Sequence, residues 1–168
     1  MADKGGDRIM ELKNRSQYLD KLISVQDMEV IKVVTGIRRC GKSSLLKLMM
    51  AHLREQGVME EQILSMNFES MQFADMDSKS LYQYVMERAP KGKRLYLFLD
   101  EVQKVRNWQD AVNSFRVDLD CDIYVTGSNA YLLSSELSTY LSGRYVEIKM
   151  LPVSYTHLRA HETSQDIV

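Results

Sequence analysis

The sequence predicts an α/β protein, a three-layer sandwich around a mainly parallel, five-stranded sheet. Two observations support this prediction. Short β-branched and apolar segments alternate along the chain with segments whose apolar residues follow helical spacing. The predicted strands are also almost continuously apolar, as expected when helices cover both faces of a sheet. Ligands of such sheets bind beyond the carboxyl ends of the strands, so the residues that follow each strand are candidates for a site.

The elements follow one another in a regular order. The predicted strands are Val30–Thr35, Ile63–Phe68, Leu95–Leu99, Cys121–Thr126 and Tyr145–Leu151. The predicted helices run from Ser43 to about Gly57 and over Ser78–Ala89, Trp108–Leu119 and Tyr131–Leu141. Residues 1–29 are expected to form a helical lead-in, and residues 30–152 the core domain.

Composition narrows the class of protein. The 168 residues are 45% hydrophobic and 27% charged, with a formal net charge of −1, which gives no overall attraction to nucleic acid or to an anionic membrane. The longest apolar runs have about five residues, too few to span a bilayer. Two distant cysteines and a polar start without a secretory signal indicate a reducing compartment, so we expect a cytoplasmic protein.

A phosphate-binding turn follows the first predicted strand. Gly36, Gly41, Lys42 and Ser43 fit the pattern G-x-x-x-x-G-K-[ST], the Walker A loop. Its backbone N–H groups and the next helix N-terminus would bind an anion, Lys42 would contact the β- and γ-phosphates, and Ser43 would ligate Mg²⁺. The predicted fold is therefore a P-loop NTPase core. Its nucleotide-binding residues are Gly36, Ile37, Arg38, Arg39, Cys40, Gly41, Lys42, Ser43 and Ser44.

Three residues inside this loop have alternative interpretations. Arg38 and Arg39 could assist phosphate binding, or they could be ordinary solvated charges. Cys40 could be a redox-sensitive thiol beside a helix N-terminus, or a small residue that fits the turn. We favour the second interpretation in both cases.

An acidic pair ends the third predicted strand. Asp100 matches the metal-holding carboxylate of a Walker B strand, and Glu101 is placed to orient and deprotonate the attacking water as a general base. The alternative is that both residues merely begin a solvated loop. The Walker A loop in the same chain favours the catalytic interpretation.

Polar residues also follow the fourth strand. Thr126, Ser128 and Asn129 stand at its tip, and Ser128 or Asn129 could position water or the γ-phosphate. The sequence Gly-Ser-Asn is equally typical of a turn. Arg144, before the fifth strand, is a candidate arginine finger, supplied in cis or by a neighbouring subunit, or else a surface charge.

Three stretches in this order carry a family resemblance: "VVTGIRRCGKSSLL", "LFLDEVQKVRNWQDAV" and "YVTGSNAYLLSSELSTYLSGRYVEIKMLP". They resemble the uncharacterised prokaryotic AAA-type ATPases, over Arg15 to Pro152. The resemblance implies an ASCE-type P-loop core that uses ATP and Mg²⁺, with a sensor at Ser128 or Asn129 and a finger at Arg144. The family continues into a C-terminal region for which this chain has no room. We therefore expect a truncated core that lacks a lid over the nucleotide and can be inactive by itself.

Residues 153–168 are expected to be a non-native tail. His157 and His161 stand four apart, like a zinc pair, but no further ligands accompany them. The eleven residues Val153–Thr163 can be translated from a nucleotide sequence that resembles the transposon-end adapter of shotgun sequencing. We therefore exclude this segment from the fold prediction.

These features together predict an ATPase that acts on the β–γ phosphoanhydride bond as a nucleotide-driven motor or switch. One alternative is a nucleotide-sensing switch module that hydrolyses slowly. Another is a DNA-associated ATPase whose DNA-binding part is missing. A P-loop kinase fits less well, because no acceptor-binding segment is evident. A homo-oligomer through Arg144 follows if the finger acts between subunits.

Overall fold

The computed structural model describes residues 4–128, 139, 141 and 143–152. Five strands form one sheet in the order β2-β3-β4-β1-β5, and every neighbouring pair is parallel. The strands are β1 (Ile31–Thr35), β2 (Ile63–Asn67), β3 (Leu95–Asp100), β4 (Cys121–Gly127) and β5 (Tyr145–Lys149). The helices are α1 (Lys4–Ser24), α2 (Lys42–Glu55), α3 (Ser78–Arg88) and α4 (Trp108–Asp118). The predicted three-layer α/β fold is confirmed, and the sheet is parallel throughout.

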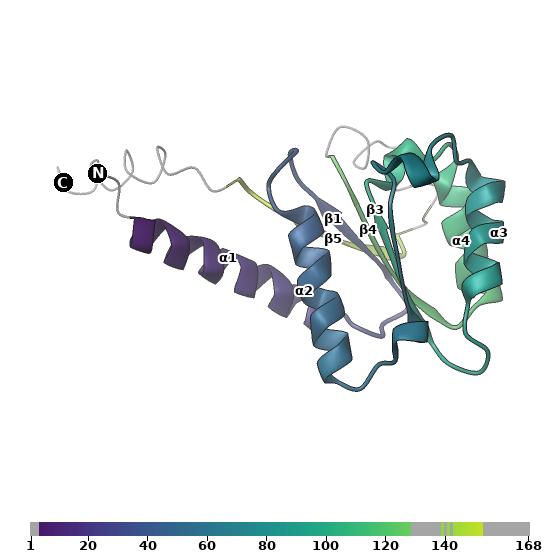
Figure 1. Cartoon of the computed structure of the whole chain (residues 1–168), viewed down its shortest axis with the longest axis horizontal. Coiled ribbons are helices and arrows are strands. Elements are labelled where there is room, and N and C mark those ends of the chain that lie inside the picture. Colours follow the sequence, from purple (N-terminus) through teal and green to yellow (C-terminus); the bar gives the residue numbers. More distant parts are fainter. Residues whose placement is uncertain (1–3, 129–138, 140, 142, 153–168) are drawn as a thin grey trace.

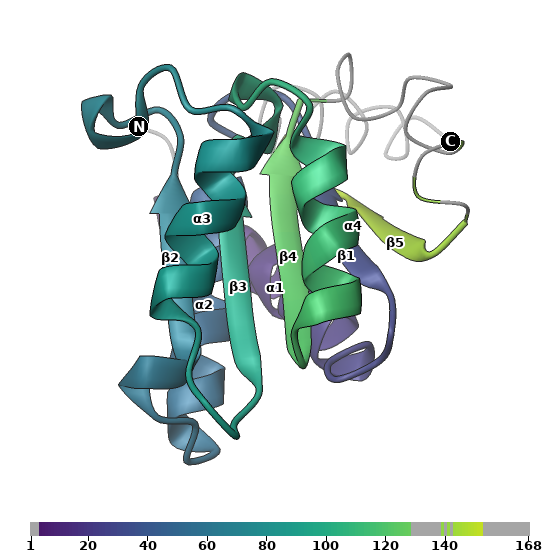
Figure 2. The ribbon, with the colours of Figure 1, turned by 90° about the vertical axis from the view of Figure 1, so that its right-hand side faces the viewer.

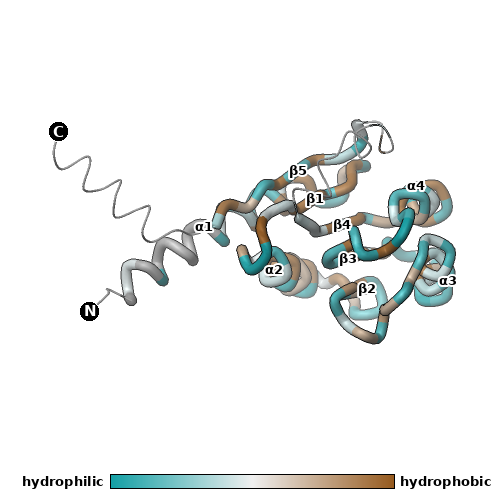
Figure 3. Tube along the Cα trace, turned by 90° about the horizontal axis from the view of Figure 1, so that it is seen from above, coloured by the Kyte–Doolittle hydropathy of each residue, from teal (hydrophilic) through white to brown (hydrophobic). Residues whose placement is uncertain are grey.

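Helices cover both faces of this sheet. Figure 1 and Figure 3 show α2 on one side and α3 with α4 on the other, and Figure 2 looks onto the face that α3 and α4 cover. Each interface has its own apolar cluster. One cluster joins α1 and α2 to the sheet and contains Leu22, Leu45 and Phe98. The other joins α3 and α4 to the sheet and contains Leu81 and Phe115. Alternate residues of the central strands supply the two clusters, as the side-chain period of two requires.

The helix α1 lies within the predicted lead-in and packs on α2, while its first turns extend away from the sheet (Figure 1). Leu22, near its end, is fully buried in the same cluster as α2. The end of this helix is therefore part of the core of the domain.

Two predictions fall outside the described residues. The helix predicted for Tyr131–Leu141 does so except at Thr139 and Leu141, and Leu141 is buried. The tail expected at residues 153–168 does so entirely, with both of its histidines. Within the described residues, no group of three or more His, Cys, Asp or Glu side chains could hold a metal ion. No helix among them is long and apolar enough to cross a membrane.

The strand order decides which loops meet. Because β4 lies between β1 and β3, the carboxyl end of β4 stands between the carboxyl ends of β1 and β3. All five strands point the same way, so these three loops share the carboxyl edge of the sheet. The segment before β5 lies at the opposite, amino edge, because Tyr145 is in register with Ile31.

Candidate active site

The loop between β1 and α2 depends on two glycines. A Cβ atom on Gly36 would stand 2.5 Å from Cys40 Sγ and 2.9 Å from the carbonyl oxygen of Met150, so any larger residue collides with backbone. Gly41 has φ +100°, a conformation that side chains rarely adopt. These constraints shape the loop that the Walker A pattern predicts.

The amino end of α2 is free to receive an anion. Its N-cap residue is Gly41, which forms no side-chain capping bond, and the first turn contains no acidic residue. The first N–H groups of a helix lack partners within the helix and carry a partial positive charge. A phosphate group would satisfy these donors.

Lys42 is buried, with 4% of its surface exposed, and points back into the loop. Its Nζ donates to the carbonyl oxygens of Gly36, at 2.7 Å, and Ile37, at 3.2 Å. The same nitrogen lies 3.4 Å from Glu101 Oε1. Glu101 is the one carboxylate among the described residues within ion-pair distance of this buried ammonium group, which suits a site for a polyanion.

The two predicted metal ligands contact each other. Ser43 Oγ donates to Asp100 Oδ2 at 2.5 Å, which joins the start of α2 to the end of β3. Asp100 is buried, with 6% exposed, and its second oxygen accepts from the hydroxyl of Thr126. Hydroxyl and carboxylate oxygens are the ligands that Mg²⁺ prefers, so this donor set fits the cation predicted from the sequence.

Glu101 stands beside the buried lysine in a restricted backbone conformation. Its φ of 57° and ψ of 50° are in the left-handed region, which costs a non-glycine residue about 1–2 kcal/mol. Its backbone N–H donates to Thr126 Oγ1 at 2.9 Å, and its side chain is 14% exposed. The side-chain amide of Gln103 donates to its Oε2 at 2.6 Å. Thr126 and Gln103 thus constrain both the backbone and the carboxylate.

Thr126 has a larger role than the sequence indicated. It is fully buried and bonds to both residues of the acidic pair, through the Asp100 carboxylate and the Glu101 N–H. The sequence places Thr126 as a polar residue at the end of β4. It can reach the end of β3 only if β3 and β4 are neighbouring strands. The sequence alone does not specify that strand order.

The candidates at the tip of β4 are described only in part. Ser128 Oγ is buried and has no hydrogen-bond partner among the described residues. An orphaned hydroxyl beside the loop is consistent with a missing ligand. Asn129, the other candidate, lies outside the described residues.

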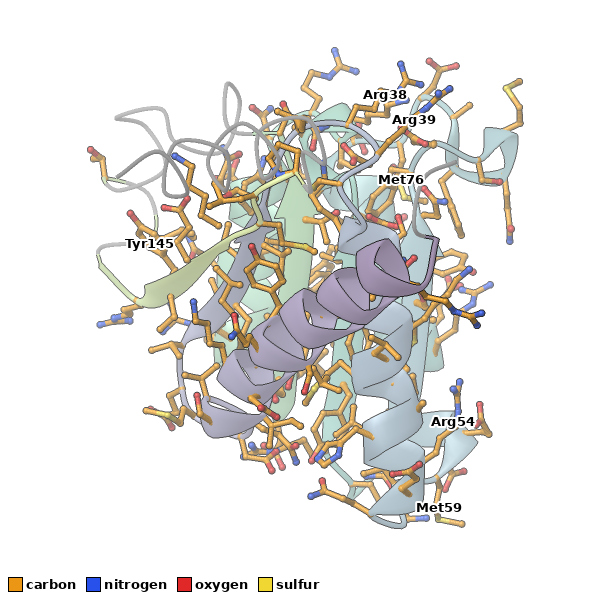
Figure 4. All side chains as sticks on the ribbon, turned by 90° about the vertical axis from the view of Figure 1, so that its left-hand side faces the viewer. Arg38, Arg39, Arg54, Met59, Met76 and Tyr145 are labelled. Carbon is orange, nitrogen blue, oxygen red and sulfur yellow. The ribbon has the colours of Figure 1, made fainter. Side chains whose placement is uncertain are left out.

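The side chains of the remaining loop residues do not point toward the lysine. Ile37 is 54% exposed, and Arg38 and Arg39 are exposed and form no ion pair with any described residue. Figure 4 shows both arginines at the top of the molecule, pointing outward. Their position agrees with solvated charges. Ser44 is half-buried in the first turn of α2.

Cys40 does not have the environment of a reactive thiol. Burial raises its pKa above the ordinary thiol value, and this outweighs the opposing effect of the Lys42 charge. A raised pKa leaves less thiolate at neutral pH. Its sulfur instead fills the space above Gly36, as the small-residue interpretation predicts.

The structure does not bring Arg144 to this site. Its carbonyl oxygen accepts from the N–H of Ile31, the first residue of β1, at 3.0 Å. The phosphate loop begins after Thr35, so the length of β1, about 16 Å at 3.3 Å per residue, separates the two. Figure 4 shows Tyr145, the next residue, well away from Arg38 and Arg39. A finger acting in cis does not fit this position.

Known proteins resemble this chain in sequence. A family model described as "AAA domain" matches residues 29–158. An uncharacterised protein of Haemophilus influenzae is 46% identical over 144 residues, which cover 84% of this chain and 36% of that protein. An uncharacterised protein of Methanocaldococcus jannaschii is 27% identical over 148 residues, 87% of this chain and 32% of that one. The chain thus spans about a third of the length of either relative.

Solved structures share the fold at low sequence identity. A chain in the structure of Drosophila ORC bound to AT-rich DNA and Cdc6 aligns with a TM-score of 0.61 at 12% identity, covering 96% of this chain and 66% of that one. The Thermotoga maritima RuvB Holliday junction branch migration motor aligns with a TM-score of 0.52 at 16% identity, covering 83% and 44%. At these identities the likeness concerns the fold.

Proposed function

We propose that this chain, which belongs to the AAA domain family, binds Mg²⁺-ATP at the carboxyl edge of its sheet and hydrolyses the β–γ phosphoanhydride bond. The observation that carries this proposal is the meeting of the phosphate loop with the acidic pair. Lys42 Nζ lies 3.4 Å from Glu101 Oε1, and Ser43 Oγ lies 2.5 Å from Asp100 Oδ2. A loop that only recognises phosphate needs no second carboxylate beside its lysine.

Binding would rest on the loop and the free end of α2. The uncapped N–H groups would receive the phosphate oxygens, and Lys42 would exchange its two carbonyl partners for the β- and γ-phosphates. Ser43 and Asp100 would hold Mg²⁺, which when bound neutralises charge on the phosphate oxygens. The orphaned hydroxyl of Ser128 would gain a partner from the nucleotide or from water.

Hydrolysis would rest on Glu101. Its carboxylate would accept a proton from the attacking water as the water oxygen approaches the γ-phosphorus. Ser128 and Asn129 would position that water or the phosphate. Asp100 stays with the cation, so the two adjacent carboxylates have separate roles.

Arg144 would act on the site of a neighbouring subunit. It is exposed at the amino edge and cannot span β1 to its own phosphate loop. A homo-oligomer that sets the amino edge of one copy against the carboxyl edge of the next would supply the finger in trans. A motor or switch driven by ATP follows naturally from a site shared between subunits.

The decisive experiment removes the lysine. Lys42→Ala should abolish ATP binding in isothermal titration calorimetry, whereas Lys47→Ala, on the exposed side of α2, should bind like the wild type. Asp100→Asn should weaken the binding that depends on Mg²⁺ more than the binding measured in EDTA. An unchanged affinity in Lys42→Ala would reject the assignment. Turnover with and without DNA then tests whether the ATPase is DNA-associated.

A further inference from the structure

We propose that Gln103 is the positioning residue for Glu101: its side-chain amide holds the carboxylate in the orientation from which one oxygen accepts the proton of water. This inference rests on the proposed function, because it concerns how the proposed base is held. Gln103 Nε2 donates to Glu101 Oε2 at 2.6 Å. The other oxygen, Oε1, faces Lys42 Nζ at 3.4 Å. The two oxygens of the carboxylate therefore have different environments.

The direction of the amide follows from charge. If the amide were turned over, its carbonyl oxygen would face a carboxylate oxygen, and two acceptors would repel each other. With the NH₂ group toward Glu101, the carbonyl oxygen of Gln103 is buried and has no hydrogen-bond partner in the part of the chain that the structure describes. The contact with Glu101 is thus the hydrogen bond that this side chain keeps, and it is charge-assisted.

The backbone around Gln103 and Glu101 holds the two side chains in place. Gln103 lies in the short helix η3 (Val102–Lys104), between the buried side chains of Val102 and Val105. Lys104 N–H donates to the carbonyl oxygen of Glu101 at 3.2 Å, which closes the turn. The left-handed conformation of Glu101, held by Thr126, directs its side chain toward Lys42 and Gln103 together.

Nucleotide binding would separate the two partners of the carboxylate. Lys42 would turn to the phosphates, so Oε1 would lose its cation, while Oε2 would keep the amide of Gln103. Oε1 is then free to take a proton from water. The water oxygen forms a bond to the γ-phosphorus, the bond from that phosphorus to the β–γ bridging oxygen breaks, and ADP and phosphate leave. Without the amide the carboxylate would rotate among several orientations, and fewer of them would meet the water.

The contact can be tested without turnover. In a ¹H–¹⁵N spectrum the side-chain amide of Gln103, identified by its loss in Gln103→Met, should be shifted from the values of an exposed glutamine. The shift should disappear in Glu101→Ala. An exposed-type resonance in the wild type, or one that Glu101→Ala leaves in place, would overturn the proposal.

The role is tested by ATP hydrolysis under single- and multiple-turnover conditions. Gln103→Met keeps the length of the side chain and removes the donor, and Gln103→Glu replaces the donor with a second carboxylate. Both should lower kcat by about 10- to 100-fold, the range for partners that orient a functional group, with an unchanged Kd for ATP. Gln72→Met, at an exposed glutamine, is the matched control. If one of the two variants loses its fold, seen as a lower melting temperature, the other assigns the amide, and the spectra of the wild type and Glu101→Ala still decide.

A double-mutant cycle separates this inference from the proposed function. In a Glu101→Gln background, Gln103→Met should lower kcat no further, because the group that it orients is already gone. An additive loss would mean that Gln103 acts elsewhere and would overturn the proposal. Normal phosphate release in Gln103→Met would remove this inference alone. Normal release in Glu101→Gln would remove the proposed catalytic role of Glu101 and this inference with it.

Discussion

The amino and carboxyl edges of the sheet each hold a buried lysine beside a carboxylate, but the two groups of residues differ in how completely they are hydrogen-bonded. At the amino edge, Lys32 on β1 is fully buried and paired with Asp122 on β4, and the lysine also donates to the carbonyl oxygen of Met28 at 2.8 Å. The second oxygen of Asp122 accepts from Tyr124 at 2.7 Å and from the backbone N–H of Asp27 at 3.0 Å. Each group of this network has its partners within the chain.

At the carboxyl edge the groups remain incompletely partnered. Lys42 is also buried, with 4% exposed, but its nearest carboxylate, Glu101, lies at 3.4 Å and is also held by Gln103. The buried hydroxyl of Ser128 has no partner within residues 4–128, 139, 141 and 143–152, and the helix α2 has no side-chain cap. A network in which every polar group has a partner stabilises one structure. A network with unpaired donors and acceptors can bind a ligand. We infer that the amino edge stabilises the fold and that the carboxyl edge carries the proposed ATP site.

The largest expected effect concerns Arg144, the one amino-edge residue with a proposed role in hydrolysis. Arg144→Ala should lower turnover by about 10³- to 10⁵-fold, the usual range for an arginine finger, with little change in ATP affinity. If the finger acts in trans, Arg144→Ala mixed with Lys42→Ala should recover part of the activity, because mixed interfaces contain one intact site. Arg54→Ala, at an exposed arginine of α2, is the control. No recovery at any mixing ratio would leave Arg144 as a structural residue.

A second experiment compares the two buried lysines directly. Lys32→Met leaves Asp122 buried without its cation and should lower the free energy of unfolding by roughly 3–5 kcal/mol. Lys42→Met should lower it less, because the Glu101 side chain is 14% exposed and keeps the hydrogen bond from Gln103, but it should abolish ATP binding. Urea denaturation followed by circular dichroism measures the first effect and calorimetry the second.

Equal losses of stability in these two variants would contradict the division between the edges. The double variant Lys32→Met/Asp122→Asn should regain part of the stability, because it removes the uncompensated charge. A double variant less stable than Lys32→Met would mean that Asp122 stabilises the fold mainly through Tyr124 and Asp27.

The sequence predicted the carboxyl edge better than the amino edge, for a physical reason. The phosphate loop and the acidic pair are local patterns, in which the chemistry fixes both residue type and spacing, so Lys42, Ser43 and Glu101 could be named in advance. Lys32 and Asp122 are 90 residues apart, and neither lies in a local pattern. Their pairing depends on β4 lying beside β1, which periodicity does not specify.

The same limit explains the predictions about Thr126 and Arg144. Thr126 was identified as polar but not as the link between strands, because that role requires β3 and β4 to be neighbours. The sequence could not distinguish a cis from a trans role for Arg144, because that depends on whether β5 runs parallel to β1. Alternation of strands and helices predicted the layers, and the order of strands within the layer decided what the residues contact.

A third and smaller effect is expected at Thr126. Thr126→Val keeps the shape of the side chain and removes the hydroxyl that bonds to Asp100 and to the N–H of Glu101. The buried groups left unpaired should cost about 1–3 kcal/mol of unfolding free energy, and turnover should fall because the acidic pair is less constrained. Thr126→Ser, which retains the hydroxyl, should recover most of both losses. If Thr126→Val behaves like the wild type and Thr126→Ser loses stability and turnover, packing of the methyl group and not the hydroxyl matters here.

The smallest expected effect is a difference between Cys40 and Cys121 in how Mg²⁺-ATP changes their rates of alkylation. Burial raises the pKa of both thiols, that of Cys121 to about 11, so at pH 8 only about one in 1000 Cys121 side chains is the reactive thiolate. Both should react with iodoacetamide more slowly than a free thiol, and faster as the pH rises, because the thiolate fraction grows. Mg²⁺-ATP should protect Cys40, which lies in the phosphate loop, and leave Cys121, at the start of β4, unchanged. Mass spectrometry of each cysteine peptide measures the two rates. Equal protection of both thiols would indicate that ATP tightens the whole domain, and the separation of the two edges would then be wrong.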